Sequence, residues 1–147
     1  MATIKRFEDL EVWQLARELN KRISLVLDKL NETKNFDLKS QLDRSAGSVM
    51  DNISEGFERD GNREFIQFLA ISKGSLGEVR SQLYRVFDRN IIDAKTQEEI
   101  NAECLLLATK ISKFIAYLNG SIYKGNKFKS GQKPETTNQK QEIITNE

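Results

Sequence analysis

Apolar residues recur at intervals of three and four along four separate segments of the chain, with polar residues between them. An α-helix turns by about 100° per residue, so this spacing gathers the apolar side chains on one helical face. The pattern predicts helices over residues 8–30, from about 38 to 58, from about 62 to 90, and over 97–122. Long helices joined by short turns predict an all-α protein, an up-down-up-down four-helix bundle.

The four periodic segments lie within residues 1–123, which form one predicted domain. The periodicity stops at Lys124. The remaining residues are rich in Lys, Gln, Asn, Thr and Gly and include the single proline, Pro134. This composition predicts a disordered polar tail over residues 124–147.

The start of the fourth helix carries a capping pattern. Thr96 precedes the apolar stripe, and Glu99 follows it three residues later. Thr or Ser at the N-cap with Glu three positions on forms a capping box, in which each side chain bonds the other's backbone amide. Thr96 is therefore the predicted N-cap.

A row of short polar residues runs beside the apolar stripe of the second predicted helix. Two interpretations remain open: a solvated shoulder of an amphipathic helix, or a polar seam buried against a neighbouring helix or subunit, where each group needs a hydrogen-bond partner. The seam interpretation is architectural and includes a helix-tying arginine. Gly56 in the same helix favours a close helix approach. The predicted seam residues are Gln41, Arg44, Ser48, Asn52 and Glu55, with Ser45 in the same row.

The third predicted helix carries small residues opposite its apolar stripe. Ala70, Gly74, Gly77 and Ser81 follow one another at intervals of four, three and four. Two glycines weaken an exposed helix, where Lys, Glu or Gln would stabilise it better. The row is either a tolerated surface or a kink, or a face that a second subunit approaches closely. We expect the second and predict an oligomer interface at these four residues.

The residue types that build most active sites are scarce. Histidine is absent and Cys104 is the single cysteine, so a zinc site of the usual Cys/His type is not expected within a chain. No phosphate-binding glycine loop occurs. Asp51, Glu55 and Glu58 lie on helical faces as ordinary charge. We therefore expect no enzymatic activity, no cofactor and no metal.

The charge pattern is nearly balanced, with a formal net charge of +1. A strongly basic domain, the usual mark of a nucleic-acid binder, is therefore not indicated. Basic residues gather locally, however, and some lie among aromatic residues that can stack on bases. The alternative for each cluster is a solvated helix surface. The candidate nucleic-acid-binding residues are Arg17, Lys21, Lys73, Arg80, Lys124, Lys127 and Lys129.

No run of about 18 apolar residues occurs, so no membrane span is expected. The first residues lack the apolar run of a secretory signal. A single cysteine fits a reducing compartment. We expect a cytoplasmic protein.

Three short motifs follow one another in the middle of the chain: Gln-x-x-Arg-Ser-Ala-x-Ser from Gln41, Asn-Ile-x-Glu-Gly from Asn52, and Gly-Ser-Leu-x-Glu from Gly74. With the flanking stretch FEDLEVWQLARELNKRI, these motifs resemble the 23S rRNA intervening-sequence protein family of bacterial four-helix bundles. The resemblance covers roughly residues 7–118. The proline that usually precedes the second helix in the family is absent here.

The resemblance implies a barrel-like homopentamer without established enzymatic activity. It also implies a relation to accessory proteins of diversity-generating retroelements, which bind nucleic acid through a basic surface. Two functions follow as expectations: an oligomer that binds RNA or DNA through phosphate contacts, or a protein-interaction scaffold whose partner docks on the oligomer.

Overall fold

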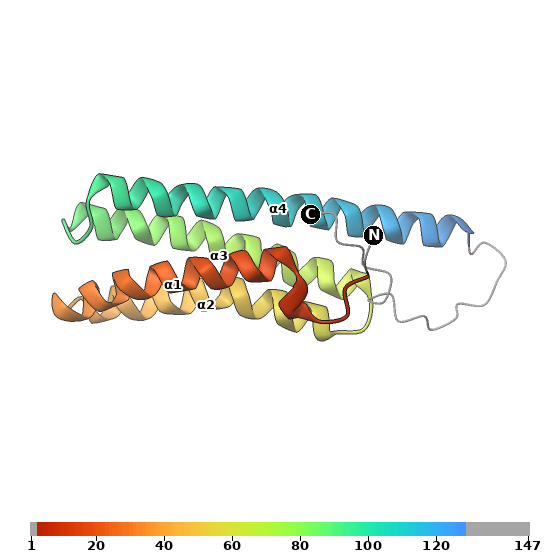
Figure 1. Ribbon diagram of the computed structural model, residues 1–147, viewed down its shortest axis with the longest axis horizontal. Helices are drawn as coiled ribbons and strands as arrows, with labels where there is room; N and C mark the ends of the chain where they lie inside the picture. The colour runs from red at the N-terminus through yellow and green to blue at the C-terminus, as the bar shows by residue number, and fades with distance from the viewer. Residues whose placement is uncertain (1–2, 129–147) are drawn as a thin grey trace.

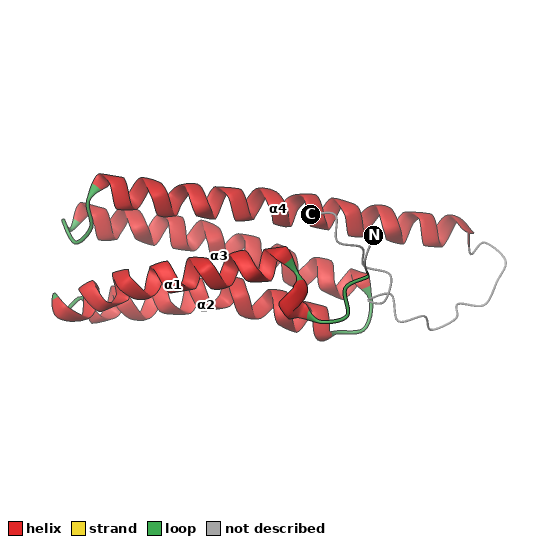
Figure 2. Cartoon of the chain, in the orientation of Figure 1, coloured by secondary structure: helices red, strands yellow, loops and turns green. Residues whose placement is uncertain are grey.

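The computed structural model describes residues 3–128, which form four α helices and no strand. The helices lie side by side and are joined by short turns (Figures 1 and 2). The prediction of an all-α fold with four helices is therefore confirmed. A 3-10 turn, Phe7–Asp9, precedes the helices, whose bounds are α1 Glu11–Glu32, α2 Phe36–Glu58, α3 Asn62–Asp88 and α4 Ala94–Phe128.

Each interhelical turn contains one residue with a left-handed backbone. These residues are Lys34 (φ 60°), Gly61 (φ 100°) and Asn90 (φ 59°). Glycine adopts positive φ without steric cost, and Asn does so more readily than most residues. The left-handed residues reverse the chain in short turns, so each helix packs beside the one that precedes it.

The core is one apolar cluster contributed by all four helices and by Ile4 and Leu10 ahead of them. Its largest fully buried side chains include Phe65 of α3 and Phe114 of α4, whose rings meet edge to face at 5.4 Å. Gly56 of α2 is buried against α3. A Cβ at Gly56 would lie 2.6 Å from Cβ of Phe68, so the close helix approach expected there is confirmed.

Side-chain contacts set the register between helices. Gln41, Ser45 and Ser48 of α2 pair with Arg85, Glu78 and Ser75 of α3, so positions rise on one helix as they fall on the other. In α1 and α4, Glu11 pairs with Lys110, and Arg22 pairs with both Glu99 and Glu103. The packing is most extensive between α2 and α3.

The fourth helix differs from its prediction at both ends. It begins at Ala94 rather than Gln97 and continues to Phe128, beyond the expected end near Ile122. In Figure 1, α4 reaches past the other three helices. Residues 124–128 are therefore helical and do not belong to the predicted tail. The predicted disorder of residues 129–147 stays a prediction, because they lie outside the described part of the chain.

The predicted capping box is wrong. Asp93, directly before α4, accepts a hydrogen bond from the Thr96 backbone amide at 2.7 Å, so Asp93 occupies the capping position. Glu99 instead forms ion pairs with Arg22 and Lys95. Asp is at least as favourable as Thr at an N-cap. Because the helix begins at Ala94, the residue at the N-cap position is Asp93 and not Thr96.

Candidate nucleic-acid interface

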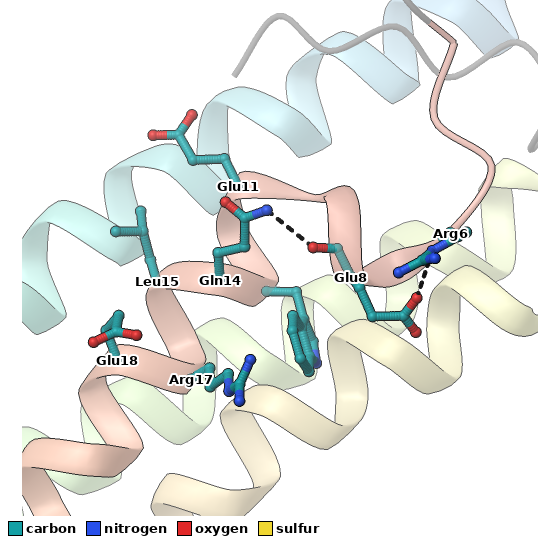
Figure 3. A pocket seen from close by; sticks show the side chains of 8 residues that line it. Arg6, Glu8, Glu11, Gln14, Leu15, Arg17 and Glu18 are labelled. Carbon is teal, nitrogen blue, oxygen red and sulfur yellow. Dashed lines mark hydrogen bonds and ion pairs between the residues drawn. The ribbon is translucent and has the colours of Figure 1, made fainter.

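Arg17 of α1 lines a surface hollow of about 640 Å³. Figure 3 shows Arg17 and Glu18 projecting from α1, and Arg6 and Glu8 on the chain that leads into it. The guanidinium of Arg17 lies 5.8 Å from the centre of the Trp13 ring. The hollow is lined by Arg6, Glu8, Glu11, Trp13, Gln14, Leu15, Arg17 and Glu18.

Charges in this region largely cancel. Lys21 forms an ion pair with Glu18 at 3.0 Å, and Arg6 forms one with Glu8 at 3.0 Å. Arg17 is exposed and has no carboxylate within ion-pair distance among the described residues. The structure therefore leaves Arg17 as the freer of the two candidate cations on α1.

The two candidate cations of α3 keep their charge available. Lys73 is exposed, and neither it nor Arg80 forms an ion pair within residues 3–128. Nε of Arg80 donates a hydrogen bond to Oδ1 of Asn101 at 2.8 Å, which fixes the guanidinium without neutralising it. Tyr84, one turn further along, is 49% exposed.

The remaining candidates lie at the end of α4 or beyond it. Lys124 and Lys127 fall in the last turns of α4, where the backbone but not the side chains is described. Lys129 lies outside the described residues. Nothing in the structure bears on these three predictions.

The small-residue row of α3 is open in the single chain. Ala70, Gly74, Gly77 and Ser81 are all exposed. An added Cβ at Gly74 or Gly77 would meet no atom within 4 Å. No neighbouring helix of the same chain therefore explains the glycines, and the predicted subunit interface is not tested by the single chain.

The polar row of α2 faces α3 over its central part. Oγ of Ser48 lies 2.8 Å from Oγ of Ser75, and Nδ2 of Asn52 donates to Oγ of Ser48 at 2.9 Å. Oγ of Ser45 donates to Oε2 of Glu78 at 3.2 Å. Ser45 and Ser75 are buried and Ser48 and Asn52 are half-buried, and these groups bond one another or exposed Glu78, as a seam requires.

The row opens to solvent toward its ends. Gln41 is half-buried and accepts a hydrogen bond from Arg85, whereas Glu55 is exposed and pairs with Arg59 on its own helix. Arg44 is exposed and forms no hydrogen bond or ion pair within the described chain, so the expectation that it ties helices together stays a prediction that the single chain does not test. Both interpretations of the row thus apply, each to a different part.

A second hollow lies at the end of the molecule where the turn between α1 and α2 meets the last turn of α3. Its volume is about 310 Å³. Its cations do not stand out in the sequence, although a predicted up-down bundle places this turn and the end of the third helix together. The lining residues are Lys34, Asn35, Phe36, Asp37, Leu38, Gln41, Arg85 and Arg89.

Groups of typical catalytic or metal-binding chemistry are sparse in the described chain. Burial raises the pKa of the Cys104 thiol to about 12, so the sulfur stays protonated at neutral pH. No group of three or more His, Cys, Asp or Glu residues able to hold a metal occurs within residues 3–128. Among these residues, no helix is long and apolar enough to span a membrane.

The fold defines an all-α protein of four long helices. Residues 8–113 match the family described as 23S rRNA-intervening sequence protein, and the chain belongs to that family. A solved structure of similar fold is a protein of unknown function from the S23 ribosomal protein family of Bacteroides thetaiotaomicron. The two share 26% identity with a TM-score of 0.67, over 71% of this chain and 97% of that one. No curated protein matches this chain.

Proposed function

We propose that this chain is the subunit of a non-enzymatic homo-oligomer of up-down-up-down bundles, a cytoplasmic pentamer that binds RNA or DNA through backbone phosphates. The observation that carries the proposal is the pairing of two features on α3. Lys73 and Arg80 present unneutralised charge directly beside the open row of Gly74 and Gly77. A subunit docked on the small row would bring its own copies of these cations close by.

Cyclic assembly multiplies a weak surface charge. A chain with a formal net charge of +1 attracts a polyanion only weakly as a monomer. A ring repeats each cationic patch in every subunit, and the summed potential of such a ring raises the local concentration of a polyanion. The membership in a family named for a ribosomal RNA intervening sequence supports a nucleic acid as the ligand.

A salt-titrated binding assay on the sized oligomer tests this function. Fluorescence anisotropy with RNA and DNA oligonucleotides should give a logarithmic salt dependence with a slope of about −0.7 to −0.9 per phosphate neutralised. The double variant Lys73→Gln/Arg80→Gln should flatten that slope. The matched control is Lys95→Gln, because Lys95 already lies 4.0 Å from Glu99. Absence of salt-sensitive binding at low ionic strength would contradict the proposal.

A protein-interaction scaffold is the second candidate, and exposed leucines favour it. Leu25 of α1 is 66% exposed, and Leu105 and Leu106 of α4 are 43% and 52% exposed. Large apolar side chains mark a protein contact where they form one contiguous patch, and Leu105 and Leu106 are consecutive in the chain. A scaffold would bind a protein partner with little dependence on salt, and nucleic acid would not compete for that partner.

A further inference from the structure

The hollow at the α1–α2 turn gathers three cations from two separate parts of the chain. Lys34 comes from the turn, and Arg85 and Arg89 come from the end of α3. None of the three forms an ion pair within the described residues. Arg85 lies in the last turn of α3 and Arg89 is its C-cap residue, where the helix dipole favours cations. The dipole therefore offsets the repulsion between the two guanidiniums, and both remain available to an anion.

Neutral amides hold both guanidiniums in place. Nη1 of Arg85 donates to Oε1 of Gln41 at 2.9 Å, and Nη1 of Arg89 donates to Oδ1 of Asn35 at 2.8 Å. A guanidinium has five donors, so each arginine keeps most of them for another acceptor. Amide acceptors orient the cations without cancelling their charge, whereas carboxylates would cancel it. Charged guanidiniums with free N–H donors bind phosphate oxygens through strong hydrogen bonds.

An aromatic residue is among those that line the same hollow. Phe36, the first residue of α2, is 56% exposed. A large apolar side chain at a helix start gains little from solvent, but an aromatic face beside cations provides a platform on which a nucleic-acid base stacks. Asp37, the next residue, is the acidic group that lines the hollow and opposes an anion there.

We propose that this hollow binds one nucleotide unit of a single-stranded nucleic acid. Arg85, Arg89 and Lys34 hold the backbone phosphate, and Phe36 stacks on an unpaired base. A base within a duplex is already stacked on its neighbours, so the ring favours single strands over duplexes. The inference rests on the proposed nucleic-acid binding and adds the residues and the strandedness that it requires.

The test measures anisotropy of a labelled single-stranded RNA, with a duplex competitor, on the full-length oligomer. Arg85→Gln/Arg89→Gln should flatten the logarithmic salt slope by up to about 0.7, since the hollow holds one phosphate and each neutralised phosphate contributes about 0.7 on single strands. Phe36→Leu should weaken binding roughly fivefold or more at an unchanged slope, and Phe36→Tyr should restore it. Asp37→Asn should tighten binding about two- to fivefold, because it removes the opposing charge and no cation.

Arg63→Gln is the matched control, because Arg63 is an exposed cation in the first turn of the same helix, at the other end of the bundle. If the double arginine variant loses helicity, Phe36→Leu and Asp37→Asn still decide the outcome. If the wild type binds nucleic acid and none of the hollow variants changes that binding, the proposed nucleotide site is wrong and the proposed function still holds. A duplex bound as tightly as the single strand also overturns the nucleotide site. A wild-type oligomer that binds no nucleic acid overturns both proposals.

Discussion

Single atoms decide how closely α2 and α3 approach. Gly56 lacks the Cβ that would lie 2.6 Å from Cβ of Phe68 and 3.0 Å from Cδ1 of Phe65. Near the middle of the same interface, Oγ of Ser72 donates to the carbonyl of Val49 at 2.6 Å in a fully buried position. A glycine gap at one end and short hydroxyl side chains along the middle let the two backbones come together while the buried hydroxyl of Ser72 keeps a hydrogen-bond partner.

Gly56→Ala should lower the free energy of unfolding. The added methyl meets a Cβ, which cannot move aside without the α3 backbone, and such overpacking costs about 1–3 kcal/mol. The helix propensity of Ala offsets up to about 1 kcal/mol of that cost. Chemical denaturation monitored by circular dichroism measures the change.

Gly47→Ala is the control on the same helix. Its added Cβ would meet only Oδ2 of Asp51 at 4.0 Å, an ordinary contact. Without a clash, propensity alone acts, and the variant should gain up to about 1 kcal/mol. Equal stability of the two alanine variants would show that the close approach at Gly56 carries no energetic weight.

Helix ends illustrate how an element is fixed by groups outside its periodic stripe. Hydrogen bonds from Thr96, through its side chain and its backbone amide, lower the pKa of Asp93 below its ordinary value. The carboxylate therefore favours the folded state while it is charged. Because the folded pKa is depressed, this contribution is present above the unfolded pKa of about 3.9 and is lost as the pH falls through the folded pKa.

Asp93→Ala should lower the melting temperature at neutral pH by about 2–4 °C through loss of the cap. The difference from the wild type should begin to shrink below a pH of about 4, the unfolded pKa, and should shrink further as the pH falls through the depressed pKa of the folded carboxylate. Asp93→Asn is the companion variant, since Asn caps without a charge and its effect should not depend on pH in this range. Thermal unfolding at neutral and acidic pH measures all three, and a difference that persists in acid would argue against the charged cap.

The pattern of the sequence predicted the helices well but their ends less well. Apolar periodicity reports burial along the middle of a helix, where every turn contributes a core residue. It is silent at Asp93, which lies outside the stripe, and at residues 123–128, where α4 extends beyond the other helices and has little core to face. Similarly, a row of polar residues shows which face they share but not where the neighbouring helix covers them, so Arg44 and Ser48 could not be separated.

The candidate site was predictable only in part for a related reason. Lys73 and Arg80 stand out because they flank an unusual small row, and the structure leaves both without ion pairs. Lys21 is also an exposed cation on a helix surface, but its charge is neutralised by an ion pair with Glu18. Lys34, Arg85 and Arg89 lie in two distant parts of the sequence and meet only through the fold. Whether a cation pairs with a carboxylate, and which cations meet at one site, depend on the three-dimensional fold. The helical spacing of residues in the sequence does not reveal them.

At the scale of the whole molecule, the open face of α3 is the feature that the single chain does not explain. In a lone subunit, long polar side chains at Gly74 and Gly77 would meet no atoms at their Cβ positions and would strengthen the helix. The same side chains at a close subunit contact would collide with the neighbouring backbone. Replacing both glycines by a long polar residue should therefore stabilise the helix of a single chain and, at the same time, break the subunit contact.

Gly74→Gln/Gly77→Gln should convert the oligomer to a species with the mass of one chain by light scattering, while helicity by circular dichroism is unchanged or increased. Gly120→Gln is the matched control, because Gly120 is also exposed in a helix and an added Cβ there would meet nothing within 4 Å. That variant should keep the wild-type mass, since it lies on α4 away from the small row. An unchanged mass in the double variant would place the subunit contact elsewhere. The cationic flank of Lys73 and Arg80 would then no longer be gathered into a ring by that face.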